Sequence, residues 1–175
     1  MRTLEEQVTQ YAAYHRDRRN IATHFVGVPM IVFSIVLALA VIRAPLGFTT
    51  TSIALVAAAA AAVYYLKLDV VLGLAMTVYL GINCFFAHEI VAVFGIAVAL
   101  WTALAVFAGG WTLQFWGHKF EGMKPAFFDD LMGLIIGPLF VMTEVFFALG
   151  LKPKLRQYVE ARVGPVVAKR THQAA

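Results

Sequence analysis

The stretch WTLQFWGHKFEGMKPAFFDD, residues 111–130, places reactive side chains between two of the most apolar segments of the chain. If this stretch is helical, Gln114, His118 and Glu121 follow one another at i, i+4 and i+7 and share one helix face. An imidazole and a carboxylate three residues apart on such a face can bind the same metal ion. A histidine and a glutamate beside a membrane can also form a solvated or interfacial pair, so the stretch alone leaves both interpretations open.

The segments around this stretch are more apolar than a soluble protein requires. The 175-residue chain is 61% hydrophobic and 14% charged, whereas soluble domains are about 25% charged. Residues 25–110 carry only four charged side chains, which are Arg43, Lys67, Asp69 and Glu89. We therefore predict one all-α integral membrane domain over residues 1–175, built as a polytopic bundle of transmembrane helices.

Charge and cysteine content exclude several other classes of protein. The net charge of +4 comes from Lys and Arg residues that flank apolar runs, without the basic and aromatic stripe of a nucleic-acid-binding surface. Cys84 is the single cysteine, so neither a disulfide nor a cysteine-based metal site can form within one chain. We expect membrane lipid as a partner and no nucleic acid, and an oligomer is compatible with the sequence.

The apolar runs predict about four full crossings, at residues 25–42, 52–66, 70–87 and 90–108. Only His88 and Glu89 separate the third run from the fourth. We place a turn there because about forty apolar residues are too many for one crossing. Gly109 and Gly110 are then expected to end the fourth helix and to release the chain into the polar stretch 111–130.

The last apolar run, residues 131–150, contains Gly137 and Pro138 in its middle. Proline removes a helical hydrogen bond and disfavours helix at the residue before it, so we expect a kinked or re-entrant segment. A full fifth crossing would also carry Lys152 and Lys154 outside, against the positive-inside rule. Glu144 is a functional candidate, since a carboxylate at membrane depth is costly unless it is paired.

The distribution of Lys and Arg predicts the orientation in the membrane. Four crossings place the following basic residues on one side: Arg16, Arg18, Arg19, Lys67, Lys119 and Lys124. We predict that this side is cytoplasmic, in a bacterial inner membrane or, for a eukaryotic protein, in the endoplasmic reticulum. His15, His24 and His118 then share the cytoplasmic side with Glu121, and His88 lies on the other side, roughly 30 Å away.

Polar segments flank the membrane region. Residues 1–24 are predicted as a largely helical surface segment, and residues 151–175 as a surface helix that stops at Gly164 and Pro165 before a tail. His15 and His24 are nine residues apart, which places them on opposite sides of a straight helix. If both bind one ion, the chain has to bend near Asn20.

Three neutral imidazoles, with or without a carboxylate, suit Zn, Fe, Cu or Ni better than Mg or Ca. A metal site at the membrane favours a lipid substrate, because an acyl chain can reach such a site from the bilayer without crossing water.

Three groups of residues follow one another in a recognisable order. They are Tyr11-Ala-Ala-Tyr14-His15 with Asn20, His24, Gly27 and Pro29; then Gln114-Phe115-Trp116-Gly117-His118 with Glu121 and Lys124-Pro125-Ala126; and then Gly137-Pro138-Leu139 with Glu144. Together these groups resemble the membrane-embedded 2-hydroxy fatty acid dioxygenases, which act in fatty acid α-oxidation. The resemblance spans nearly the whole chain, in a bacterial-looking form whose membrane portion is short and rich in alanine.

The resemblance implies an iron(II)-dependent enzyme that uses O2 to shorten a 2-hydroxy fatty acid by one carbon. His15, His24 and His118 match the motif histidines and would be the Fe(2+) ligands. The remaining site residues that we assign are catalytic Glu121, Gln114 and Asn20, and substrate-binding Lys124, Arg19, Glu144 and Tyr14. For Glu121 two roles stay open, a fourth ligand or an acceptor that orients His118.

A non-catalytic membrane carrier or assembly protein is the alternative, with the histidines as a structural metal site or as interfacial groups. Metal content and O2 uptake distinguish such a carrier or assembly protein from the enzyme. A di-iron desaturase is a weaker hypothesis, because such membrane sites need about eight histidines. The chain has five, and one of them, His172, lies in the tail.

Overall fold

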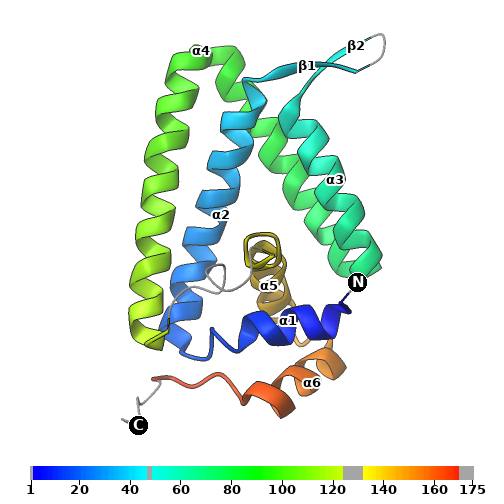
Figure 1. The fold of residues 1–175 in the computed structure, drawn as a ribbon, viewed down its shortest axis with the longest axis vertical. Helices are drawn as coiled ribbons and strands as arrows, with labels where there is room; N and C mark the ends of the chain where they lie inside the picture. The colour runs from blue at the N-terminus through cyan, green and yellow to red at the C-terminus, as the bar shows by residue number, and fades with distance from the viewer. Residues whose placement is uncertain (1, 47–48, 124–131, 170–175) are drawn as a thin grey trace. The chain divides into compact units, whose positions relative to one another are not determined.

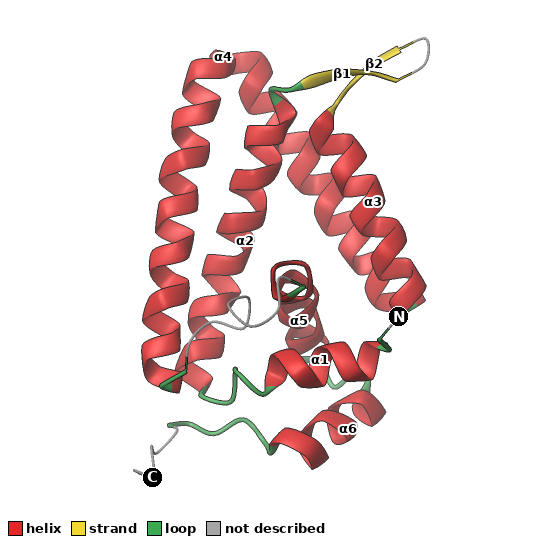
Figure 2. Cartoon of the chain, viewed as in Figure 1, coloured by secondary structure: helices red, strands yellow, loops and turns green. Residues whose placement is uncertain are grey.

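The computed structural model describes residues 2–46, 49–123 and 132–169, and these residues are almost entirely helical (Figures 1 and 2). The elements are α1 (Leu4–Ala12), α2 (Arg18–Ala40), β1 (Arg43–Leu46), β2 (Thr49–Ser52), α3 (Ile53–Leu68), α4 (Val70–Glu121), α5 (Gly133–Ala148) and α6 (Pro153–Val163). The chain forms two compact units. One comprises Met1–Pro29 and Trp111–Ala175, and the other comprises Met30–Gly110.

Small side chains form the core of the second unit. Leu37, Ala40, Ala54, Cys84, Ala87, Ala99 and Ala103 belong to one buried cluster. Alanine at such contacts lets helices approach closely, which is how helices associate in an apolar solvent. The thiol of Cys84 is buried and lies 3.9 Å from the carbonyl oxygen of Ala54, which agrees with a structural role for this residue.

Side-chain caps mark where the helices of this unit begin. Ser52 Oγ accepts a hydrogen bond from the Leu55 amide at the start of α3. Asp69 Oδ1 accepts one from the Leu72 amide at the start of α4, which agrees with the predicted boundary between the runs 52–66 and 70–87. The antiparallel hairpin of β1 and β2 between α2 and α3 was not expected.

The interruption of α4 lies at Gly95 and not at His88 and Glu89, so the predicted turn position is wrong. His88 is helical, and its Nδ1 lies 2.6 Å from the Cys84 carbonyl oxygen one turn earlier. Gly95 has φ 79° and ψ 170°, a conformation that is essentially restricted to glycine. Figure 1 shows α4 as two arms joined by a sharp turn.

Two further helix ends also differ from the prediction. The helix α4 continues through Gly109 and Gly110 to Glu121, so the helix does not end at these glycines as predicted. Likewise α5 continues through Gly137 and Pro138. The sharp bend comes later, between α5 and α6, whose axes differ by 113° across a short break.

The apolar surface of the helices agrees with a membrane environment. Among the described residues, α2 and α4 are long and apolar enough to cross a bilayer, and the bent pair of α5 and α6 would make a third span. Side chains along α4 such as Val93, at 67% exposure, and Trp101, at 72%, are left uncovered by the described residues. The arms 70–94 and 96–121 each have the length of one crossing, and four crossings remain a prediction.

The first unit contains α1, α5 and α6. Thr3 and Glu6 form a capping box at the start of α1, and the apolar face of this helix buries Leu4, Val8 and Tyr11. This face packs on α5 and α6. The helix α6 ends at Gly164, which has φ 78°, so the predicted C-terminal helix and its stop are present, and its place at the membrane surface stays a prediction.

Candidate metal centre

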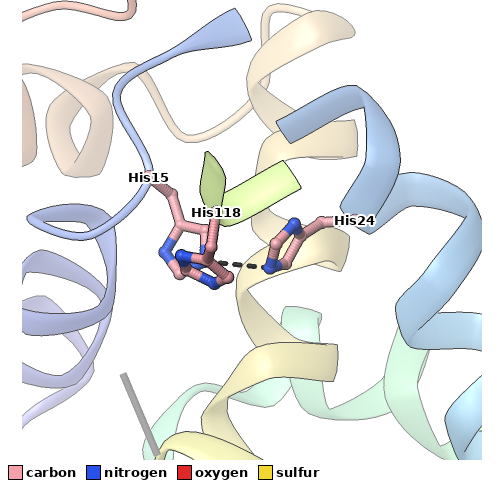
Figure 3. Close-up of side chains that lie close together, drawn as sticks. All are labelled: His15, His24 and His118. Atoms are coloured by element: carbon pink, nitrogen blue, oxygen red, sulfur yellow. Dashed lines mark hydrogen bonds between the residues drawn. The ribbon is translucent and has the colours of Figure 1, made fainter. Parts of the chain in front are cut away.

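Three buried histidines meet in the first unit. His15 lies in the connection between α1 and α2, His24 lies in the second turn of α2, and His118 lies near the end of α4. Their rings point toward one another (Figure 3), and one ring nitrogen from each lies within 4.8 Å of the others. The bend that brings His15 to His24 occurs at residues 13–17, because α2 already begins at Arg18. The bend that we expected near Asn20 is therefore misplaced.

Hydrogen bonds to the backbone determine which nitrogens face the centre of this cluster. Nδ1 of His15 lies 2.7 Å from the Tyr11 carbonyl oxygen, and Nδ1 of His24 lies 2.9 Å from the Asn20 carbonyl oxygen. A carbonyl oxygen can only accept, so both Nδ1 atoms carry the proton. The two Nε2 atoms lie 3.0 Å apart. Two lone pairs that face each other at this distance repel unless a proton or a metal ion lies between them.

A divalent transition metal fits this arrangement. Burial, followed by the nearby rings of His24 and His118, holds the pKa of His15 well below its usual value, so the ring is neutral and can donate a lone pair at pH 7. Nδ1 of His118 is buried and makes no hydrogen bond to the described residues. Imidazole nitrogens in a dry setting suit Fe, Zn, Cu or Ni, so the histidine cluster is a candidate metal centre.

The carboxylate of Glu121 holds the His15 connection in place. Glu121 is 1% exposed, and its oxygens accept hydrogen bonds from the backbone amides of Arg16, at 3.0 and 3.1 Å, and Asp17, at 2.9 Å. The Asn20 side-chain amide donates a third bond, at 3.0 Å. Charge-assisted bonds of this kind are stronger than neutral ones. Glu121 and Asn20 therefore position the residues next to His15.

Two further contacts brace the same connection. The fully buried carboxylate of Asp17 accepts hydrogen bonds from the backbone amide and guanidinium of Arg19. On the other side, the amide of Val167 donates to the Arg16 carbonyl, and the Arg18 amide donates to the Val167 carbonyl, each at 2.9 Å. Nη1 of Arg16 also donates to the carbonyl of Gly164. We call residues 164–167 the C-terminal strap.

Gly117 allows α4 to approach α2 beside the cluster. A Cβ atom at this position would lie 2.1 Å from Oγ1 of Thr23 and 2.6 Å from Oδ1 of Asn20. Both distances are far shorter than van der Waals contact. Only glycine fits here, and it precedes His118, so the close approach of the two helices brings that ring to His24.

Aromatic rings cover the cluster. The Tyr11 ring stacks on His15 with centroids 4.3 Å apart, and Phe140 of α5 lies 5.3 Å from the same imidazole. A Cβ on Gly137 would lie 2.9 Å from the Tyr11 hydroxyl. The glycine that was expected to break α5 instead makes room for Tyr11.

The other predicted site residues have different surroundings. Gln114 is buried on the same face of α4 as His118 and Glu121, and its Nε2 has no hydrogen-bond partner within the described residues. The guanidinium of Arg19 is bound to Asp17. Oε1 of Glu144 lies 3.8 Å from Nη2 of Arg16. The carbonyl of Tyr14 accepts a bond from Asn20. Lys124 and His172 lie outside the described residues.

His88 belongs to the second unit, where its Nε2 lies 2.8 Å from Oγ of Ser52. The candidate metal-binding group found among the described residues does not include it.

Sequence reasoning missed Tyr11, Gly117 and Phe140. Tyr11 and Gly117 stand inside the quoted motifs, and Tyr11 precedes His15 by four residues, which was a usable signal. Phe140 is one of many apolar residues in its run, and nothing in the sequence distinguishes it.

Comparisons with known proteins show which proteins the chain resembles. A family model described as 2-hydroxy-palmitic acid dioxygenase Mpo1-like matches residues 1–149. The chain is 30% identical over 161 residues to 2-hydroxy-palmitic acid dioxygenase MPO1 of Saccharomyces cerevisiae, an alignment that covers 90% of this chain and 87% of the yeast protein. No solved structure matches the chain. The matched range contains all three histidines of the cluster and Glu121.

Proposed function

The chain belongs to the 2-hydroxy-palmitic acid dioxygenase Mpo1-like family, and on this premise we propose that it is a membrane-bound, iron(II)-dependent dioxygenase that uses O2 to shorten 2-hydroxy fatty acids by one carbon. Homology to a named dioxygenase supports an oxidoreductase role. The observation that carries the proposal is the buried cluster of His15, His24 and His118, whose nitrogens converge within 4.8 Å.

In this proposal His15, His24 and His118 hold the iron. A ferrous ion with only three protein ligands would supply the electrons that activate O2 and the open positions for a hydroxy acid. Glu121 and Asn20 keep His15 in place through the backbone of Arg16 and Asp17. Positioning of this kind is a large part of what a protein contributes to catalysis.

Gln114 and the aromatic rings have separate roles in this proposal. The unpaired Nε2 of Gln114 can donate a hydrogen bond to an oxygen of the bound acid, because a buried donor without a partner is costly until a ligand satisfies it. Tyr11 and Phe140 pack around His15 and exclude water from that side of the cluster. Lys124 and Tyr14 remain candidates for contact with the carboxylate. Arg19 is weaker in this role, since Asp17 already binds its guanidinium.

The proposed activity is tested with the purified chain in detergent after loading with Fe(II). Addition of 2-hydroxyhexadecanoic acid should cause uptake of one O2 per acid and should yield pentadecanoic acid. Hexadecanoic acid, which lacks the hydroxyl, is the matched control and should give no uptake. A chain that binds no metal, or that holds zinc without turnover, would instead support the non-catalytic carrier or assembly protein.

A further inference from the structure

A second feature of the first unit lies outside the histidine cluster. Residues of α2, α5, α6 and the C-terminal strap line a groove of about 440 Å³, which is within the range of about 300 to 1,000 Å³ for small-molecule sites. Seven of its twelve lining residues are apolar and five are charged. We call it the arginine groove, because its cationic residues are Arg16, Arg18 and Arg156.

The charges in the arginine groove do not cancel. Arg156 donates to Glu160 at 2.8 Å, and Arg16 lies 3.8 Å from Glu144. These two contacts use both glutamates of the lining. The guanidinium of Arg18 is exposed, and the described residues offer it no partner. The lining therefore keeps one uncompensated positive charge, and it lies on Arg18.

The apolar part of the groove begins beside this charge. Arg18, Ile21, Ala22 and Phe25 follow at i, i+3, i+4 and i+7 and form one stripe along α2. Phe147 of α5 and Val159 of α6 also line the groove. A ligand complementary to this surface carries one negative charge and has an apolar tail.

The groove is separate from the histidine cluster but connected to it. His24 projects from a different face of α2 than the stripe that begins at Arg18, since the 100° spacing of helical residues sets them apart. Arg16 joins the two regions, because its Nε donates to the His15 carbonyl at 2.9 Å while its Nη2 faces Glu144 in the groove.

We propose that the arginine groove is a loading site for long-chain carboxylic acids, in which the carboxylate pairs with Arg18 and the tail lies along the apolar stripe of α2. This inference rests on the proposed function for the identity of the acid. A monoanion is favoured over a phosphate, because Glu144 and Glu160 would repel a second negative charge.

Equilibrium binding of radiolabelled hexadecanoic acid to the purified chain in detergent tests the proposal without requiring turnover. Arg18→Gln should raise the dissociation constant about tenfold, as expected for loss of a charged hydrogen bond. Hexadecanol has the same tail without the charge, so its binding should change little. Arg162→Gln on α6 is the matched control, because Arg162 does not line the groove. Equal binding of the acid to the parent and to Arg18→Gln would overturn the proposal.

A second pair of variants tests the apolar wall. Ala148 is exposed and lines the groove, and its neighbour Leu149 is exposed at 68% and does not line it. Ala148→Trp should fill the groove and weaken binding of both the acid and the alcohol at least about tenfold, while Leu149→Trp should bind as the parent does. Undiminished binding of the acid to Ala148→Trp would place the acid elsewhere and overturn the proposal.

Steady-state kinetics separate this proposal from the proposed function. A loading site delivers the acid to the histidine cluster and takes no part in the chemical step, so Arg18→Gln should raise KM for a 2-hydroxy acid and leave kcat at saturation unchanged. Absence of turnover in the parent would contradict the dioxygenase assignment, and the binding assay would still decide the groove. Turnover with unchanged KM and unchanged binding in Arg18→Gln would overturn the groove and leave the dioxygenase standing.

Discussion

Ring nitrogens of His15, His24 and His118 face one another. Those of His88 face the Cys84 carbonyl oxygen and Oγ of Ser52. This difference predicts which substitutions remove the metal. His15→Ala, His24→Ala and His118→Ala should each reduce bound iron from about one ion per chain to near zero, because three ligands leave none to spare. His88→Ala and His172→Ala should retain the metal. Elemental analysis of the purified variants measures this directly. Loss of iron from His88→Ala as complete as that from His118→Ala would contradict the assignment of the site.

Glu121 acts through the backbone on His15, so its removal should weaken the site and not erase it. Glu121→Gln replaces one accepting oxygen with a donor that faces the amides of Arg16 and Asp17. We expect a loss of about 1–3 kcal/mol in the free energy of unfolding and metal affinity about 10 to 100-fold lower. Titration against a competing chelator measures the affinity, with Glu5→Gln as the control. Unchanged affinity would remove Glu121 from the site.

At the scale of elements, Gly117 sets the distance between α2 and α4. Gly117→Ala should lower the free energy of unfolding by about 1–3 kcal/mol through overpacking against Thr23, and it should lower metal affinity by displacing His118. Gly81→Ala in the same helix meets no atom within 4 Å, so it should be neutral or stabilising by up to about 1 kcal/mol. Thermal unfolding of both variants, and of Gly117→Ala combined with Thr23→Ala, tests this. The double variant should recover part of the loss.

The helix α4 shows which features of the site could be predicted from the sequence. Spacing predicted that Gln114, His118 and Glu121 share a face, and α4 confirms it, because spacing within one helix depends only on its period. The partners of Glu121 lie 101 to 105 residues earlier, and two of them are backbone amides, which carry no signal in the sequence. The turn at Gly95 was missed because no feature of the sequence distinguishes this glycine from the others in the helix. Glycine is frequent in membrane helices, and apolar residues flank Gly95 and Gly81 alike.

At the scale of the whole molecule, the C-terminal strap contacts the residues beside His15 from outside the matched family region, which ends at residue 149. A chain ending at Val163 loses the bonds from Gly164 and Val167 to Arg16 and Arg18. We expect its metal affinity to fall at least about tenfold, as when a supporting contact is lost. A chain ending at Lys169 keeps these bonds and is the control. Equal metal content and affinity in the two shortened chains would show that the strap is dispensable.

The wide separation of these contacts along the chain has a consequence for biosynthesis. His15 and His24 leave the ribosome early, but their third partner follows some hundred residues later, and Arg16 pairs with a carbonyl 148 positions further on. Domains fold during synthesis only once their contacting segments have emerged. On the proposed function, the iron site can therefore form only when translation is nearly complete, and until then the nascent N-terminal histidines stay open to other cellular cations.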